Sequence, residues 1–461
     1  MSMKNSLIKD LENNLPRRNI LSSREECYAY SVDASNPKGD SSIADAVVFV
    51  ENVEQVQKIV KIANEHKIPI ICRGAGTNVV GACATPCGGI VLNFSRMNHI
   101  LSLNPQNMTI KVEPGVIVED IRKAAQEQGL YYPPAPSNMK VSTIGGSIAQ
   151  NSAGAESFKY GTTKDYVLDL TVVMADCQIL KTGSNTIKNA AGYNLTSLFT
   201  GSEGTLGIIV DATLKLIPQP EVKKVLMAYF DTTENSIMAV NSIIEKKIRP
   251  STIDFMDKNA LQTVERFYPA NLRIDKECAL IIEIDGFECD IEYQKDNIIN
   301  IMKEHNATDI QYSSNEDEFN RIWMARRSSM GACAMLKPNV TTDDVIVPRE
   351  NLSKLVKRIQ CICEKYNLTP CLVGHVGDGS IHPQIPIDYK DETEYKNYKL
   401  AKSEIYKLTA ELGGTISGEH GIGSAKKEYL PGVINAAALN YMRTIKQTFD
   451  PNNILNPYKI F

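Results

Sequence analysis

Apolar residues recur at helical spacing early in the chain, just ahead of a short apolar run. The members of this stripe lie three or four positions apart: Val56, Ile59, Val60 and Ala63. Asn52, with Gln55 three residues later, is typical of a helix start. The apolar run at 68–71 predicts a strand. We therefore expect a helix followed by a strand here, within a strand-rich and glycine-punctuated region of about 220 residues.

A second pattern begins near residue 222, where strand-like segments alternate with helical stretches. The strand-like segments are residues 225–230, 252–256, 279–284 and 345–347. Such alternation is typical of an antiparallel sheet covered by helices. The sequence thus predicts an α+β protein in which a second domain begins near residue 220.

Length and composition narrow the class of protein. At 461 residues the chain is too long for one ordinary core, so two or three domains are expected. Its 43% hydrophobic and 23% charged residues are typical of a globular protein in water. The net charge of -4 leaves no basic surplus, so nothing favours a nucleic-acid partner.

No apolar run is long enough for a membrane span, and the polar residues 1–6 lack the apolar core of a signal peptide. We therefore expect a cytoplasmic location. The eleven cysteines are scattered and never form a CxxC pair. This favours reduced thiols, with no disulfide framework and no iron–sulfur cluster held by this chain.

Three glycine-rich segments lie in the first half of the chain. Residues 73–78 resemble a dinucleotide-binding turn. A Rossmann motif, however, would have its third glycine two residues later and would be followed in sequence by a helix. Residues 79–89 instead contain three more glycines and Pro86, which no helix tolerates. Further loops are expected at 143–154 and 201–207. Together they predict backbone N–H groups wrapped around a large ligand that carries a pyrophosphate.

Half of the six histidines lie in two short glycine-rich segments beside acidic residues. His375 and His382 are seven positions apart, and His420 follows Glu419 directly. Imidazole with carboxylate is the ligand set of a divalent transition metal or of a proton-transfer centre. Two histidines with Glu419 would leave open positions on zinc, iron or manganese, and the spacing alone does not choose among these metals.

Nine motifs occur in the order found in one enzyme family. They are residues 73–77, 112–116, 132–134, 143–154, 188–193, 201–207, 374–382, 418–421 and 449–457. Over nearly its full length the chain resembles the FAD-linked 2-hydroxyacid dehydrogenases and oxidases, a family that includes glycolate oxidase D subunits, D-lactate dehydrogenases and D-2-hydroxyglutarate dehydrogenases. The resemblance implies the vanillyl-alcohol oxidase fold with its PCMH-type FAD-binding domain.

The implied organisation is α+β throughout. It places an FAD-binding domain of two α+β subdomains at 1–220 and an α+β cap domain with an antiparallel sheet at 221–410. A C-terminal segment at 411–461 would return to the FAD-binding domain.

The resemblance also implies which residues contact FAD. They are Arg73, Gly74, Ala75, Gly76, Thr77, Asn78, Pro134, Thr143, Gly146, Asn151, Gly154, Ile208, Ile209 and Asn456. The first two loops would hold the pyrophosphate and ribityl chain, Ile208 and Ile209 the adenine end, and Asn456 would come close to the isoalloxazine. Covalent relatives in the wider superfamily have histidine where Thr77 stands, so we expect noncovalent FAD.

For catalysis, the resemblance assigns His375, His382 and Glu419 as ligands of a divalent zinc, iron or manganese ion. It assigns His420 as the proton-transfer residue. Arg326 would pair with the substrate carboxylate in a bidentate fork, and Arg327 is the alternative.

These assignments imply oxidation of a small D-2-hydroxyacid, with D-lactate or glycolate favoured, to the 2-oxoacid. Ser380 and Gln384 replace residues that are common in the family beside the histidines, and they bear on substrate choice. No nicotinamide fingerprint is present, so electrons should leave FAD for an electron-transferring flavoprotein, an iron–sulfur subunit, a quinone or oxygen. A homodimer and a hetero-oligomer both stay open.

Two functions from other classes also stay open. A metal-dependent hydrolase would use the histidine motifs but would have no need of the three glycine-rich loops. A non-catalytic flavin-binding subunit would keep the loops but would be free to lose His375, His382 and His420, which are present here.

Overall fold

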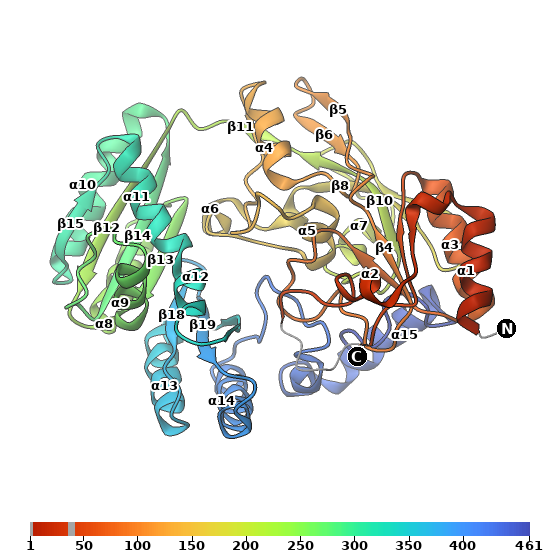
Figure 1. The fold of residues 1–461 in the computed structure, drawn as a ribbon. Coiled ribbons are helices and arrows are strands. Elements are labelled where there is room, and N and C mark those ends of the chain that lie inside the picture. Colours follow the sequence, from red (N-terminus) through yellow and green to blue (C-terminus); the bar gives the residue numbers. More distant parts are fainter. Residues whose placement is uncertain (1–2, 36–41) are drawn as a thin grey trace. The chain divides into compact units, whose positions relative to one another are not determined.

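The computed structural model describes residues 3–35 and 42–461, and the chain divides into two compact units (Figure 1). The first unit comprises Met1–Ala153, Thr162–Gln219 and Glu419–Phe461, and the second comprises Gly154–Gly161 and Pro220–Gly418. Neither unit is one continuous stretch of chain. Residues 1 and 2, on which the expectation of no signal peptide partly rests, lie outside the described residues.

The first sheet of the first unit has the strand order β1–β2–β4–β3. Its strands are β1 (Ile20–Leu21), β2 (Ala46–Phe49), β4 (Ile90–Asn93) and β3 (Ile70–Arg73). Strands β2, β4 and β3 run parallel, and β1 pairs antiparallel with β2. The backbone of residues 454–456 continues the sheet beside β3, because Ile70 donates its N–H to Ile454 at 2.7 Å and accepts one from Asn456 at 2.8 Å.

Helix α3 (Val53–His66) covers this sheet and confirms the helix predicted from the apolar stripe. The side chain of Asn52 accepts the N–H of Gln55 and caps the helix. The stripe residues are buried in a core shared with α1 (Met3–Asn14) and the strands. The predicted strand at 68–71 is also confirmed, since β3 begins at Ile70.

The second sheet of the first unit is antiparallel, in the order β5–β6–β10–β8–β9. Its strands are β5 (Ile100–Asn104), β6 (Thr109–Val112), β10 (Ile208–Lys215), β8 (Val167–Val173) and β9 (Ile179–Gly183). Strands β7 (Leu130–Tyr131) and β11 (Ile217–Pro218) form a separate short pair. The other helices of this unit are α2 (Arg24–Tyr28), α4 (Val118–Gln126), α5 (Ile144–Gln150), α7 (Leu195–Phe199), α15 (Ala436–Phe449) and the 3₁₀ turns Arg17–Asn19, Thr163–Asp165 and Lys427–Gly432.

The expectation of a continuous loop at 143–154 is wrong, because α5 occupies Ile144–Gln150. The side chain of Thr143 accepts the N–H of Gly146 and so caps the helix. Ile144 and Ile148 are fully buried, and their burial offsets the poor helix propensity of the two glycines. Asn151 ends the helix in the left-handed region, with φ of 50°.

The second unit is built on an eight-stranded antiparallel sheet. Seven strands follow in the order β15–β12–β14–β13–β18–β19–β16, and β17 also pairs with β19. Their bounds are β12 (Val222–Phe230), β13 (Thr252–Asp257), β14 (Cys278–Gly286), β15 (Thr308–Tyr312), β16 (Asn339–Thr342), β17 (Val345–Ile346), β18 (Cys371–His375) and β19 (Ser380–Ile387). All four predicted strands are confirmed as β12, β13, β14 and β17.

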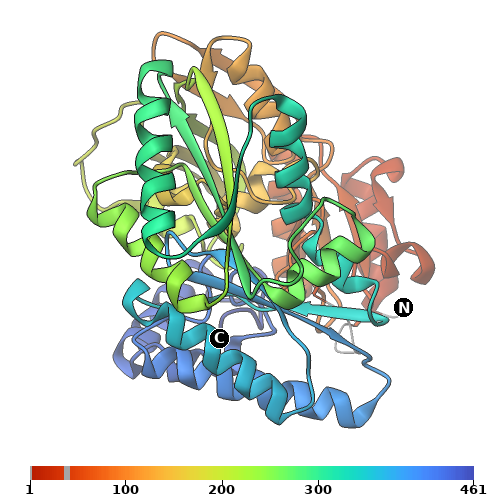
Figure 2. The ribbon, with the colours of Figure 1, turned by 90° about the vertical axis from the view of Figure 1, so that its left-hand side faces the viewer.

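Helices cover this sheet, as the alternating pattern predicts (Figure 2). Their bounds are α6 (Ser157–Tyr160), α8 (Thr233–Glu245), α9 (Lys258–Phe267), α10 (Glu288–Glu304), α11 (Glu316–Arg327), α12 (Ser329–Ala334), α13 (Leu352–Lys365) and α14 (Glu392–Glu411), with a 3₁₀ turn at Arg349–Asn351. Helices α9, α11 and α12 share one apolar core with β12, β13, β14 and β18. This core includes residues of β18, the strand that carries His375.

All eleven cysteines carry free thiols. Among the helices of residues 3–35 and 42–461, none is both long and apolar enough to cross a membrane.

Candidate functional site

The first two histidines of the motif lie on neighbouring strands of the second unit. His375 is the last residue of β18, and His382 lies near the start of β19, where it is only 6% exposed. A tight turn joins the strands, and its Gly379 has φ of +92°. A side chain at Gly379 would be strained there and would meet the carbonyl oxygen of Val347 at 2.3 Å. The glycines of the motif therefore build the hairpin that places both rings.

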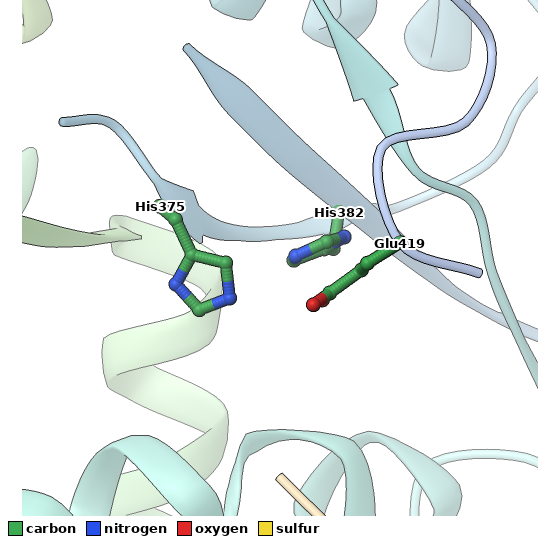
Figure 3. A group of neighbouring side chains, drawn as sticks. All are labelled: His375, His382 and Glu419. Atoms are coloured by element: carbon green, nitrogen blue, oxygen red, sulfur yellow. The ribbon is translucent and has the colours of Figure 1, made fainter. Parts of the chain in front are cut away.

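His375, His382 and Glu419 come together, with one possible ligand atom from each lying within 4.8 Å of the others. The two imidazole rings meet edge to face, with centroids 5.2 Å apart. Figure 3 shows a ring nitrogen of each histidine and the carboxylate of Glu419 directed toward a common space. Glu419 directly follows Gly418, the last residue of the second unit.

Two imidazole nitrogens and one carboxylate at this separation are a donor set that suits a divalent metal ion. Such a set leaves coordination positions open for a substrate. The chemistry of the donors therefore fits the metal that the resemblance implies.

A buried carboxylate that sequence reasoning missed supports His375. Asp254 of β13 lies directly opposite His375 in the antiparallel register. Its Oδ1 lies 2.6 Å from Nδ1 of His375, and its Oδ2 lies 2.7 Å from Nε of Arg326. Burial alone would raise the pKa of the Asp254 carboxyl, but His375 and Arg326 outweigh this effect and hold the pKa below its usual value. The only sequence signal was an acidic residue inside an apolar strand.

A second buried carboxylate, Asp344, lies beside His382. Its Oδ1 is 3.7 Å from Nδ1 of His382. Its Oδ2 accepts the backbone N–H of Gly418 at 2.7 Å and the hydroxyl of Ser417 at 3.3 Å. Asp344 thus fixes the chain just before Glu419 and contacts the hairpin at the same time. Sequence reasoning missed this residue too.

The predicted carboxylate-binding arginine lies in the last turn of α11. The Arg326 side chain is 11% exposed, and its Nε pairs with Asp254. The neighbouring Arg327 instead stacks its guanidinium over the ring of Trp323, 5.5 Å from the centroid. The two arginines therefore have different surroundings. Arg326 is the one that shares Asp254 with His375 of the cluster.

In the first unit, the segment 73–78 packs closely against the start of α5. A Cβ at Gly74 would lie 2.0 Å from Oγ1 of Thr143. Gly76 has φ of +74°, and a Cβ there would meet the guanidinium of Arg73 at 2.1 Å. Arg73 in turn donates to the carbonyl oxygen of Val32 at 2.6 Å. Glycine is therefore required at both positions, and both residues are partly exposed.

The segment that carries His420 is fixed by two residues of the glycine-rich segments. Asn78 donates its side-chain N–H to the carbonyl oxygen of His420 at 3.1 Å. The carboxylate of Glu203 accepts the N–H groups of Ile422 at 2.7 Å and Gly423 at 2.8 Å. Burial raises the pKa of Glu203. Glu203 was not predicted, although it lies within the glycine-rich segment 201–207.

Asn456 is almost fully buried in the first unit. Its Nδ2 donates to the carbonyl oxygens of Ala82 at 2.9 Å and Glu203 at 2.7 Å. Its Oδ1 is buried and has no hydrogen-bond partner among the described residues. An acceptor left in this state is costly unless a ligand donates to it. The site therefore fits a cofactor with N–H groups, as FAD has.

The other predicted FAD contacts differ in how far they are buried. Pro134 is buried, Ala75 is exposed, and Thr77 is half-buried. Ile208 is fully buried in the core of the first unit, and Ile209 is half-buried.

Gly154 is the first residue of the short segment that belongs to the second unit, and its N–H donates to Oγ of Ser157 at 3.0 Å. The other predicted FAD contacts are assigned to the first unit.

Two family models match the chain. A family model described as an FAD binding domain matches residues 44–183, and one described as the C-terminal domain of FAD linked oxidases matches residues 219–460. The chain is 42% identical to the glycolate oxidase subunit GlcD of Bacillus subtilis (strain 168), over 94% of this chain and 92% of that protein. It is 33% identical to a D-lactate dehydrogenase of Anaerostipes hadrus, over 90% of this chain and 89% of that protein.

Among solved structures, p-cresol methylhydroxylase with bound substrate matches with a TM-score of 0.84 at 18% identity, covering 100% of this chain and 97% of that one. A likeness at this identity shows the fold alone, and it confirms the expected vanillyl-alcohol oxidase type. The protein is an FAD-dependent oxidoreductase, and the chain belongs to the family of FAD-linked 2-hydroxyacid dehydrogenases and oxidases.

Proposed function

We propose that the protein oxidises a small D-2-hydroxyacid to the 2-oxoacid with the help of one divalent metal ion, with D-lactate or glycolate as the favoured substrate. The observation that carries this proposal is the cluster of His375, His382 and Glu419. The names of the relatives, a glycolate oxidase subunit and a D-lactate dehydrogenase, support this substrate class.

The proposed ligands of the metal are His375, His382 and Glu419. A zinc, iron or manganese ion held there would act as a Lewis acid toward the carboxylate and α-hydroxyl of the substrate. Arg326 binds the substrate carboxylate and orients the α-carbon. His420 takes the hydroxyl proton as the carbonyl group forms.

FAD, when bound, supplies the chemistry of accepting two electrons and the hydrogen of the α-carbon. The residues proposed to hold it are the predicted contacts at 73–78, Pro134, Thr143, Gly146, Asn151, Gly154, Ile208, Ile209 and Asn456. The unpartnered Oδ1 of Asn456 and the crowded glycines Gly74 and Gly76 support this assignment. Because Thr77 offers no imidazole, the FAD is noncovalent.

Electrons then pass to a separate acceptor. The Bacillus subtilis relative is named as a subunit, which supports a partner protein here. An iron–sulfur subunit or an electron-transferring flavoprotein fits that role, and a quinone or oxygen is the alternative.

The first experiment is a dye-reduction screen across D- and L-2-hydroxyacids, on protein of measured metal and FAD content. We expect turnover with D-lactate or glycolate, and release of all the yellow colour as FAD on acid precipitation. Flavin that stays with the pellet would contradict noncovalent binding. A preparation active only on L-isomers would contradict the substrate class.

The second experiment removes the metal. Chelation should abolish turnover but leave the flavin spectrum largely intact, because the metal is proposed to bind substrate rather than FAD. His382→Ala should do the same, whereas His305→Ala, which alters a histidine bonded to Ser242 on another part of the second unit, should not. Full activity of a verified metal-free preparation would disprove metal assistance.

A further inference from the structure

We propose that Asp254 is a positioning residue that orients His375 and Arg326 together, and so couples metal binding to recognition of the substrate carboxylate. This inference rests on the proposed function. It concerns a residue outside the three ligands, the proton-transfer histidine and the arginine assigned above.

The geometry of the sheet places Asp254 between its two partners. Strands β13 and β18 pair antiparallel, with Asp254 directly opposite His375. The two oxygens of the carboxylate are divided between the partners, at 2.6 Å from Nδ1 of His375 and 2.7 Å from Nε of Arg326. One side chain on a rigid strand therefore sets the positions of two others, one from β18 and one from α11.

Burial makes this contact costly to break. Asp254 is 1% exposed, and a buried carboxylate is tolerated only when it is paired and hydrogen-bonded. The charged groups that face it are His375, Arg326 and the more distant His382. Removing either close partner would leave a buried charge with one oxygen unsatisfied.

For His375, the contact selects which ring nitrogen can bind a metal. With Nδ1 held against Asp254, the other nitrogen, Nε2, is left for coordination. Figure 3 shows a ring nitrogen of His375 directed toward His382 and Glu419, as this selection requires. A carboxylate behind a metal-binding histidine also makes the ring a stronger donor.

For Arg326, the same carboxylate forms an ion pair with the Nε edge of the guanidinium. Because Nε is the guanidinium nitrogen nearest to Asp254, the end of the group with its two terminal nitrogens is the one that could receive the substrate carboxylate in a two-point fork. The arginine that binds the carboxylate and the histidine that binds the metal thus share one anchor. A substrate that contacts both groups meets them at a spacing that Asp254 sets.

Asp254→Asn tests this arrangement, because an amide has a single acceptor oxygen and must present N–H to one of its two partners. The matched control is Asp257→Asn on the same strand. Asp257 is equally buried but accepts the N–H groups of Ala260 and Leu372, which an asparagine oxygen can also do.

The first measurement is the affinity for Zn²⁺ of the FAD-loaded protein, by competition with a chromogenic chelator. We expect Asp254→Asn to bind about 10–100-fold more weakly, the usual loss when a supporting residue of a metal ligand is removed, while Asp257→Asn binds as the wild type does. With Co²⁺ in place of Zn²⁺, only Asp254→Asn should change the visible d–d spectrum.

The second measurement is the dissociation constant of the hydroxyacid at saturating metal, for Asp254→Asn, Arg326→Lys and the double variant. We expect each single variant to weaken binding and the double variant to add little to the larger single effect, because both changes act on one contact. If the losses in binding free energy of the two single variants added up in the double variant, Asp254 and Arg326 would act independently and the inference would be overturned.

Asp254→Glu covers the case in which the asparagine variant does not fold. It keeps the charge but moves the carboxylate by one methylene, so a positioning role predicts weaker Zn²⁺ binding here as well. Wild-type Zn²⁺ affinity in a folded Asp254 variant would overturn the inference alone. If the wild-type protein itself bound no metal, the proposed function would fail and this inference with it.

Discussion

The glycine-rich segments of the first unit and the histidine cluster of the second unit are built in different ways. At 73–78 and at the start of α5, neighbouring atoms fill the space that a side chain on the glycines would need. In the cluster, the side chains of His375, His382 and Glu419 converge, the buried Asp254 contacts His375 at 2.6 Å, and the buried Asp344 lies 3.7 Å from His382. Substitutions at the glycines should therefore act by steric crowding. Substitutions at the cluster should act by removing atoms that can bind a metal or a substrate.

The largest effect is expected at His420, whose segment is fixed through the backbone by Asn78 and Glu203 but whose proposed role is chemical. His420→Asn should slow flavin reduction by about 10²–10⁴-fold at saturating hydroxyacid, because it removes the proton acceptor. Stopped-flow absorbance measures this rate. His99→Asn, at an exposed histidine of the same unit that pairs with Glu113, serves as the control. An unchanged rate in the His420 variant would exclude His420 as the base.

Next in size is Arg326→Lys, which keeps the charge and loses the planar fork. It should weaken substrate binding by about 1.5–3 kcal/mol, the scale of a hydrogen bond to a charged group. The defect should appear mainly in the apparent affinity for the hydroxyacid, measured by steady-state kinetics. Arg327→Lys is the comparison, since Arg327 stacks on Trp323 instead. If only that variant lost affinity, Arg327 would be the carboxylate ligand.

Gly145→Ala tests the packing at the glycines. A Cβ at Gly145 would lie 2.6 Å from Cβ and 2.9 Å from the carbonyl oxygen of Pro114, so the backbone of α5 must shift. We expect FAD binding to weaken by about 1–3 kcal/mol, the usual cost of overpacking. Fluorescence titration of the flavin-free protein measures it. Gly432→Ala, where a Cβ would meet nothing within 4 Å, is the control. Wild-type affinity in Gly145→Ala would show that the segment adapts.

The smallest effect concerns Asp257, a buried carboxyl of the second unit outside the cluster. Burial raises its pKa to about 7. Its stabilising contribution is fully present below the unfolded-state pKa near 3.8 and is lost as the pH rises through about 7. Asp257→Asn should therefore be more stable than the wild type above pH 7, by roughly 1 kcal/mol or more, and the difference should shrink toward pH 4. Thermal unfolding across this range checks the sign, and a constant difference would contradict it.

Local sequence patterns predicted much of this molecule because their causes are local. The stripe from Val56 to Ala63 predicted α3, and Asn52 caps that helix as expected. His375 and His382 could be predicted as metal ligands because few other residue types suit a metal. In the structure they come together with Glu419.

What the sequence did not reveal depends on contacts between distant segments. Asp254 supports His375 across 121 positions of sequence, and nothing in its own strand indicates that partner. Glu203 fixes Ile422 and Gly423 in the same way, across the length of the second unit. The glycines and other small residues of 143–154 predict a loop, and the burial of Ile144 and Ile148 stabilises the helix that forms there instead.

The way residues 454–456 continue the first sheet beside β3 has a consequence for biosynthesis. A nascent chain emerges from the ribosome from its N-terminus, and domains generally fold as units during synthesis. The parallel strands β2, β4 and β3 precede the second unit in sequence, but the residues that pair with the free side of β3 follow it and are made after it. The first unit therefore cannot complete its sheet until translation has passed the whole second unit. Until then, the edge of β3 depends on other protection from pairing with a neighbouring chain.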